Sequence, residues 1–331
     1  MSSEKIAIIG SYGCGKTVLL SVLTHKYQKY TESGFQIRPM NQAAVTFCTK
    51  KWSNLEQGKW PAPTPPAPTP PIYRWEIIRG SKKKQIVTSD IAGEAWSSFI
   101  TQQVESCEEK ETKSILDSLK KQWDALPQKL APKEIESHIT TVQNLLKNAS
   151  GIMLLLDLKQ IINKEPGSDL AMFLPIALEQ YMKHIHRAYV PITLVLSKVD
   201  EYQYEFDEAE GGLEEVVHKY IPYLPHLRTI ISVSAVSNTK NNCPAPGFNS
   251  KGLDELCDNI WGIMSSSGLR EKKRTFLRLL YLDLPILAGL FVVYLLLVII
   301  SPYAWICSVF FWISIVVYLL SRLYFFLTKP R

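Results

Sequence analysis

The segment from Lys5 to Thr17 limits the possible folds more than any other part of the chain. Four apolar residues, Ile6–Ile9, predict a short buried strand, and an apolar helical pattern begins at Val18. Between them lies Gly10-Ser11-Tyr12-Gly13-Cys14-Gly15-Lys16-Thr17, which has the form Gly-x-x-x-x-Gly-Lys-Thr. In this strand–loop–helix order, the glycines let backbone N–H groups surround phosphate oxygens, and the helix N-terminus adds its positive dipole. The segment therefore predicts a phosphate-binding loop within an α/β sheet.

Two side chains of this loop have separate expected roles. Lys16 is expected to bridge the β- and γ-phosphates of a bound nucleotide, and Thr17 to hold Mg²⁺ through its hydroxyl. The remaining loop residues are expected to contact the phosphates; they are Gly10, Ser11, Tyr12, Gly13, Cys14 and Gly15.

Strand-like and helical patterns alternate along residues 1–269, which predicts an α/β domain. We expect a mainly parallel six-stranded sheet with helices on both faces, and a hairpin at Arg79-Gly80-Ser81 makes one edge antiparallel. The six expected strands are Lys5–Ile9, Ile72–Ile78, Gln85–Ser89, Gly151–Asp157, Ile192–Leu196 and Thr229–Val233.

Two segments lie outside a minimal core of this kind. Residues 60–71 contain seven prolines and are expected to be extended and exposed. Residues 95–150 are expected to be a helical insertion, in which apolar spacing and Pro132 predict two helices. These helices form either an antiparallel arm or a surface cover for the sheet, and the sequence leaves both open.

The run Ser197-Lys198-Val199-Asp200 follows an apolar strand and resembles the [Asn/Thr]-Lys-x-Asp guanine signature of P-loop GTPases. The resemblance implies that Asp200 accepts two N–H bonds from guanine and that Lys198 lies over the base. Ser197 departs from the usual Asn or Thr but keeps a hydroxyl. Because adenine offers no matching donor pair, this resemblance implies GTP and GDP as ligands, and a P-loop ATPase is the alternative.

Two further motifs extend the resemblance over roughly residues 4–265. Asp90-Ile91-Ala92-Gly93-Glu94 looks like the Asp-x-x-Gly switch motif, so Asp90 would reach Mg²⁺ through water and the Gly93 N–H would sense the γ-phosphate. Ser234-Ala235-Val236 resembles the loop whose backbone contacts the guanine oxygen. Each motif follows an expected strand, and their order is that of the Ras-like GTPases.

Three residues bear on hydrolysis. A Trp-Pro-x-x-Thr segment ahead of the switch motif is similar to the double-GTPase type of bacterial conflict and signalling systems, which implies that Thr64, or else Thr69, closes over Mg²⁺ and the γ-phosphate. Glu94 stands where many relatives have the Gln that orients the attacking water, and Tyr12 would crowd an arginine finger. We therefore expect slow intrinsic turnover.

The C-terminal part carries the positive charge of the protein. Residues 270–331 hold eight basic and two acidic residues, which gives +6, whereas residues 1–269 have 37 − 8 = 29 basic and 31 − 2 = 29 acidic residues. A neutral body disfavours nucleic-acid binding, because phosphate backbones need a basic face. Six cysteines without a Cys-x-x-Cys pair argue against a zinc site or a disulfide framework.

Residues 284–321 form an uncharged apolar run, long enough for two membrane-spanning helices that turn at Ser301-Pro302. A basic linker, 270–283, precedes the run and a basic tail, 322–331, follows it, so both flanks are expected on the cytoplasmic side, beside anionic lipid. A shallow re-entrant hairpin and a buried soluble hairpin are the alternatives.

The sequence as a whole predicts a membrane-anchored GTPase that binds GTP or GDP with Mg²⁺ and acts as a molecular switch with a protein partner or by self-association. The alternative is a GTP-gated, oligomerising membrane effector or scaffold in which hydrolysis is incidental. A dynamin-like machine is disfavoured, because the stretch of chain between the last domain helix and the first expected span is too short to form a stalk.

Overall fold

The computed structural model divides the chain into two units, Ser3–Ser267 and a C-terminal unit from Gly268 that includes the first two residues. All residues that the structure describes lie in the larger unit. They are residues 5–10, 13–29, 34–62, 67–104, 130–163, 168–187, 190–201, 215, 217–219, 221, 229–237, 239–240, 243–245 and 247–262.

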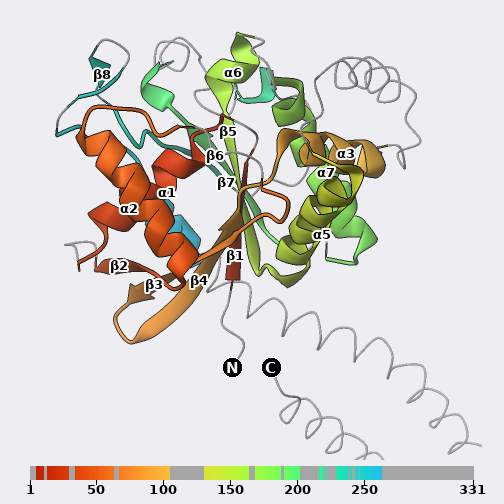
Figure 1. The fold of residues 1–331 in the computed structure, drawn as a ribbon, viewed down its shortest axis with the longest axis horizontal. Coiled ribbons are helices and arrows are strands. Elements are labelled where there is room, and N and C mark those ends of the chain that lie inside the picture. Colours follow the sequence, from red (N-terminus) through yellow and green to blue (C-terminus); the bar gives the residue numbers. More distant parts are fainter. Residues whose placement is uncertain are drawn as a thin grey trace, which may run out of the picture. The chain divides into compact units, whose positions relative to one another are not determined.

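A seven-stranded sheet forms the centre of this unit, in the order β2-β3-β4-β1-β5-β6-β7 (Figure 1). The pairs from β4 to β7 are parallel, and β2-β3 and β3-β4 are antiparallel. The strands are β1 (Lys5–Gly10), β2 (Phe35–Pro39), β3 (Ile72–Arg79), β4 (Lys82–Ser89), β5 (Gly151–Asp157), β6 (Ile192–Ser197) and β7 (Thr229–Ser232).

All six expected strands are present, and the predicted hairpin joins β3 to β4. Gly80 sits in its turn with a φ of 57°, a left-handed conformation that glycine adopts without steric cost. The expected number of strands was wrong, because β2 adds a seventh at the antiparallel edge. Its pattern Phe-Gln-Ile-Arg-Pro is only five residues long, and the strand depends on pairing with β3.

Alternate residues of the central strands enter two separate cores. On β1, Ala7 and Ile9 pack on one side of the sheet, while Ile6 and Ile8 pack on the other. On β5, Leu154 and Leu155 divide in the same way. Because both faces are covered, these strands read as continuous apolar runs rather than as alternating patterns.

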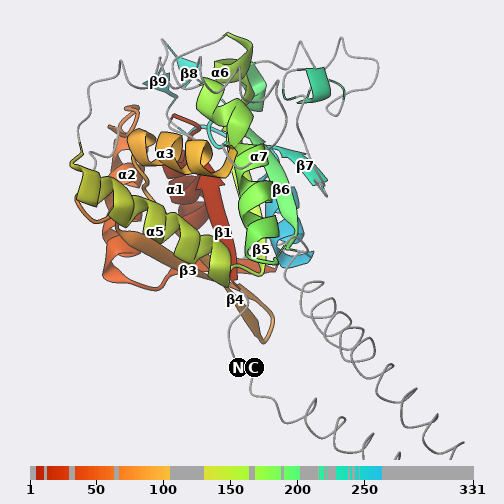
Figure 2. The same cartoon turned by 90° about the vertical axis from the view of Figure 1, so that its right-hand side faces the viewer.

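Helices form a layer on each face of the sheet (Figures 1 and 2). One layer contains α1 (Lys16–Lys26), α2 (Gln42–Glu56) and a helix over residues 253–262. The other contains α3 (Gly93–Val104), α5 (Pro132–Asn148) and α7 (Ser168–His184). A short helix, α6 (Leu158–Ile162), and a 3-10 turn, η1 (Val199–Glu201), follow β5 and β6. A small ribbon pairs β8 (Thr239–Lys240) with β9 (Cys243–Pro244).

The second helix expected in the insertion corresponds to α5, and it covers the sheet rather than extending away from it. Ile139, Val142 and Leu146 on α5 are buried in the same core as Trp96 and Phe99 on α3. For this helix the structure favours the surface-cover alternative. The first expected helix of the insertion lies outside the described residues.

The basic linker, the expected spans in 284–321 and the basic tail also lie outside the described residues. Within the part of the chain that the structure does describe, none of the helices has both the length and the apolar character needed to cross a bilayer.

Candidate functional site

The predicted motifs meet at one edge of the sheet, where the parallel strands end. β1 ends at Gly10, β4 at Ser89, β5 at Asp157 and β6 at Ser197. In an open α/β sheet, ligands bind outside the carboxyl ends of the strands. Segments separated by more than 180 residues in the sequence therefore contribute to one site.

The loop between β1 and α1 leaves a helix N-terminus free for an anion. Gly13 and Gly15 have φ values of 77° and 79°, in the left-handed region that side chains other than glycine rarely adopt. No side chain caps α1, and its first turn contains no acidic residue. By contrast, Asn41 accepts a bond from the Ala44 N–H at the start of α2. The uncapped N–H groups and the helix dipole of α1 suit a phosphate.

Gly10 lets this loop pass close to β5. A Cβ atom at Gly10 would lie 2.5 Å from the Cys14 sulfur and 2.8 Å from the carbonyl oxygen of Leu155. Any larger residue would therefore push the start of the loop away from the neighbouring strand.

Lys16 and Asp90 lie close together at this edge. The Lys16 amine donates to the Ser89 carbonyl at 3.1 Å and lies 3.8 Å from Asp90 Oδ1. The other oxygen of Asp90, Oδ2, is buried and has no hydrogen-bond partner in the described part of the chain. Burial, and then the charge of Asp90, raise the pKa of Tyr73 to about 12. The site therefore holds a lysine amine beside a buried carboxylate oxygen that no described residue satisfies.

Ser197 connects the phosphate-binding loop to the end of β6. Its hydroxyl lies 2.8 Å from the Cys14 carbonyl oxygen and 3.2 Å from the carbonyl oxygen of Leu156. Both contacts are buried. The residue that departs from the Asn or Thr of the signature therefore holds the backbone of the loop through its hydroxyl.

Lys198 is held by an aspartate that the sequence analysis did not single out. Lys198 has a φ of 56°, and its amine lies 2.5 Å from Oδ2 of Asp157, a buried residue at the end of β5. The other carboxylate oxygen, Oδ1, accepts the backbone N–H groups of Lys159 and Gln160 and so caps α6. An aspartate at the end of an apolar strand and before a helix was the available signal, because that position favours an N-cap.

Asp200 presents a buried oxygen without a partner. It lies in η1, and its Oδ1 finds no hydrogen-bond donor among the described residues. The N–H of Val199 donates to the Val233 carbonyl at 3.4 Å, which places the turn beside the end of β7. A buried carboxylate oxygen without a donor is costly, so a ligand with N–H groups would satisfy it.

The predicted loop Ser234-Ala235-Val236 follows β7 and is braced by residues 249–252. The backbone N–H groups of Ser234 and Lys251 each donate to the other residue's carbonyl, at 3.1 and 2.8 Å. Gly252 permits this contact, because a Cβ there would lie 2.2 Å from the Ser232 carbonyl oxygen. The Ser234 hydroxyl is buried and without a partner within the described ranges. Sequence reasoning missed this brace, because it depends on a contact between segments that are distant in the sequence.

The proline-rich segment is anchored through its carbonyl groups by three side chains. Lys51 on α2 donates to Ala62 at 2.6 Å, Ser89 donates to Pro71 at 2.7 Å, and His138 on α5 contacts Ala67 at 2.7 Å. Partial burial lowers the pKa of Lys51, while the charge of Asp90 opposes that shift. Proline has no N–H group, so carbonyls are the natural anchors of such a segment. Neither Lys51 nor His138 belongs to a sequence motif, and nothing in the sequence alone indicated them.

Four predicted site residues cannot be placed by side chain. Ser11, Tyr12 and Thr64 lie outside the described residues, and for Glu94 only the backbone, in the first turn of α3, is described. Gly93 is the first residue of α3. Thr69, the alternative to Thr64, is exposed in the proline-rich segment. The other predicted residues lie where β1, β4, β6 and β7 end or in the segments that follow these strands.

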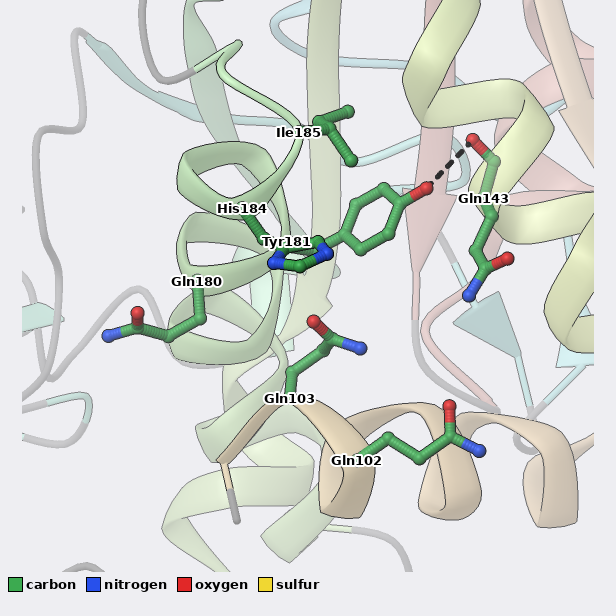
Figure 3. A pocket seen from close by; sticks show the side chains of 7 residues that line it. All are labelled: Gln102, Gln103, Gln143, Gln180, Tyr181, His184 and Ile185. Carbon is green, nitrogen blue, oxygen red and sulfur yellow. Dashed lines mark hydrogen bonds between the residues drawn. The ribbon is translucent and has the colours of Figure 1, made fainter. Parts of the chain in front are cut away.

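A groove elsewhere on the unit is not suited to phosphate. It has a volume of about 400 Å³ and lies between α3, α5 and α7 (Figure 3). Four glutamines line it together with Tyr181, His184 and Ile185, and the lining contains no lysine or arginine. The Tyr181 hydroxyl donates to the Gln143 carbonyl at 3.5 Å. The described residues contain no group of three or more His, Cys, Asp or Glu side chains that could hold a metal ion by themselves.

No protein-family model matches this chain. No curated protein matches it either. Several solved structures align with most of it at low similarity. The elongation factor SelB from Methanococcus maripaludis, in complex with the GTP analogue GppNHp, is 14% identical over 80% of this chain and 34% of its own, with a TM-score of 0.35.

The other alignments are similar in strength. Roco2 RocCORdC from Methanosarcina barkeri, bound to GDP, is 13% identical over 80% of this chain and 49% of its own, with a TM-score of 0.33. The small COPII coat GTPase Sar1 from Encephalitozoon cuniculi, in complex with GDP, is 10% identical over 81% and 83%, with a TM-score of 0.37. The chain thus spans about a third of SelB and half of the Roco2 fragment. All three TM-scores are below 0.5.

Proposed function

We propose that this protein is a GTP-binding molecular switch that hydrolyses GTP slowly at the carboxyl edge of the sheet. One observation carries the proposal: Asp200 Oδ1 is buried without a donor, in a turn tied through Ser197 to the loop that leads to Lys16. A phosphate-binding loop and a base-reading carboxylate are thereby coupled through a single hydroxyl.

The arrangement of the second loop favours guanine over adenine. Guanine carries an N–H and an exocyclic NH₂ side by side, and a carboxylate accepts from both at once. Adenine has no such pair, so it would leave Asp200 Oδ1 unsatisfied at the cost of a buried acceptor. Lys198, oriented by Asp157, would cover the base, and backbone N–H groups of residues 234–236 would donate to the guanine oxygen.

Mg²⁺ fits the residues on the phosphate side. The buried Oδ2 of Asp90 lacks a partner, and Thr17 stands at the start of α1, so two hard oxygen donors of the kind that Mg²⁺ prefers are available. Thr64 would supply a third. When bound, the ion neutralises charge on the β- and γ-phosphates during transfer.

The chain's own residues have separable tasks in hydrolysis. Lys16 stabilises the phosphate charge, and Glu94 orients the attacking water but places a negative charge near the γ-phosphate. That repulsion, and the bulk of Tyr12, support slow turnover. They also favour the second candidate, a GTP-gated oligomerising effector in which hydrolysis is incidental, and single-turnover kinetics would separate the two.

We further propose that residues 284–321 anchor the protein in a membrane as a two-helix hairpin. The GTP-binding unit and the tail would both lie on the cytoplasmic side, with the basic residues of 270–283 on anionic lipid. The uncharged run and its basic flanks support this. A protein partner or a second copy of this chain would distinguish the GTP-bound form from the GDP-bound form, in a signalling or conflict system of the double-GTPase type.

Equilibrium titration of the full-length protein in detergent with Mg²⁺ tests the proposal. GDP and GppNHp should bind at least 100-fold more tightly than ADP and the corresponding adenine analogue, since discrimination by a buried hydrogen-bonding group is worth several kcal/mol. A matched variant, Lys16→Ala, should lose binding of all of them. Equal affinity for adenine and guanine nucleotides would contradict the assignment.

A further inference from the structure

His138 joins two segments that are far apart in the sequence, the loop after Asp90 and the proline-rich segment. The residue sits on α5 and is fully buried, with an exposed fraction of 0%. Its Nδ1 accepts the backbone N–H of Ala92 at 3.1 Å, and its Nε2 lies 2.7 Å from the carbonyl oxygen of Ala67. One side chain therefore contacts both the loop after Asp90 and the proline-rich segment.

The two partners determine the form of the imidazole. An amide N–H can only donate, so Nδ1 must be the bare nitrogen and accept. A carbonyl oxygen can only accept, so Nε2 must carry the proton and donate to it. The ring is neutral in this arrangement, and both of its nitrogens are satisfied.

A side-chain bridge of this kind suits a segment rich in proline. Ala67 lies between Pro66 and Pro68, neither of which has an N–H group, so this stretch has few donors for backbone pairing. The other two anchors join the proline-rich segment to α2 through Lys51 and to the end of β4 through Ser89. Among the contacts described, His138 is the residue that ties this segment directly to the loop after Asp90.

We propose that His138 is a positioning residue that couples the proline-rich segment to the loop after Asp90, so that the γ-phosphate orders both together. Thr64 lies three residues before Ala67, and Gly93 directly follows Ala92. If Thr64 and the Gly93 N–H both contact the γ-phosphate, ordering of one segment brings the other segment into place through the imidazole of His138. The inference rests on the proposed function, because it assigns His138 a part in distinguishing GTP from GDP.

Each end of the bridge can be removed separately. In His138→Asn the side-chain oxygen can replace Nδ1 and accept from Ala92, but the contact with Ala67 is lost. In His138→Gln the longer amide can replace Nε2 and donate to Ala67, but the contact with Ala92 is lost. His138→Ala removes both. Val142→Ala is the matched control, because Val142 is buried on the same helix and contacts neither segment by hydrogen bond.

The test measures Kd for GppNHp and for GDP, both with Mg²⁺, on the full-length protein and each variant, alongside the melting temperature. We expect all three His138 variants to lower the affinity for GppNHp relative to GDP by about tenfold, the order of one lost buried hydrogen bond. Val142→Ala should lower the melting temperature and leave that ratio unchanged.

Two results would overturn the coupling. One is a GppNHp-to-GDP ratio in His138→Gln and His138→Asn equal to that of the unmodified protein. The other is an equal loss of the ratio in Val142→Ala, which would make the effect one of helix stability. Failure of the unmodified protein to bind either guanine nucleotide would instead refute the proposed function, so the two failures are distinguishable.

Discussion

The hydroxyl of Ser197 lies 2.8 Å from the carbonyl oxygen of Cys14, so the last residue of β6 holds the phosphate-binding loop that follows β1. The two residues are 183 positions apart in the chain. This bond makes the position of the phosphate site depend on the same loop that carries Lys198 and Asp200, and substitutions at Ser197 should affect both ends of a bound nucleotide.

Ser197→Ala should weaken GDP binding by about tenfold, because a buried carbonyl oxygen loses its donor at a cost of roughly 1–3 kcal/mol. Ser197→Thr keeps the hydroxyl and should bind nearly as the unmodified protein does. Isothermal titration with Mg²⁺·GDP measures the effect. Ser53→Ala, at an exposed position on α2, is the control. An equal loss of GDP affinity in this control would contradict a specific role for the Ser197 hydrogen bond.

Gly10→Ala should destabilise the protein and impair nucleotide binding together. The new Cβ would lie 2.8 Å from the backbone oxygen of Leu155, and a backbone atom of a central strand cannot move aside easily. We expect a loss of about 1–3 kcal/mol in the free energy of unfolding, typical of overpacking. Urea denaturation provides the measurement.

Gly262→Ala is the matched control for Gly10→Ala, since a Cβ there meets nothing within 4 Å. It should leave the free energy of unfolding unchanged or slightly raised, because alanine favours a helix. A Gly10→Ala protein as stable as this control would contradict the close packing of the loop against β5.

The sequence was sufficient to predict the elements whose signals are local. The strands β1 and β5 are buried on both faces and contain uninterrupted apolar runs, and β6 is apolar apart from Thr193 and Ser197. Gly10–Thr17 and Ser197–Asp200 begin at the last residues of β1 and β6, so their meeting at one edge follows from a parallel sheet. These features depend on the order of residues along a short stretch of chain.

What the sequence could not predict depends on contacts between distant segments. β2 is a short, mixed strand whose identity comes from its pairing with β3, not from its composition. Asp157 orients Lys198 across 41 positions, and His138 contacts Ala67 across 71. In the expected insertion, the apolar face of α5 fits a sheet cover or an arm equally well, and only the packing on α3 distinguishes them.

Because Cys257 is buried, we expect the free energy of unfolding to depend on pH in the alkaline range. Burial raises the pKa of its thiol from 9.0 to about 12. Above pH 9 the unfolded chain releases this proton and the folded chain retains it, so the free energy of unfolding should fall as the pH rises from 9 towards 12. One retained proton contributes a slope of about 1.4 kcal/mol per pH unit.

Urea denaturation at several pH values between 8 and 11 measures this slope in the unmodified protein and in Cys257→Ala. The variant should be less stable at pH 8 because it leaves a cavity, yet it should lose stability less steeply above pH 9. Cys243→Ala, at an exposed position, is the control and should keep the original slope. Identical slopes in the Cys257 variant and the unmodified protein would contradict the burial of this thiol.

The identity of the base that Asp200 reads is the central claim, and Asp200→Asn tests it most directly. An amide replaces one acceptor oxygen with an NH₂ donor, so it repels the N–H groups of guanine and pairs with the carbonyl that xanthine has at the same position. Titration of the full-length variant with GDP and xanthosine diphosphate should show GDP affinity reduced at least 100-fold and xanthosine diphosphate bound more tightly than by the unmodified protein. Unchanged GDP affinity in Asp200→Asn would show that this carboxylate does not read the base and would contradict the account.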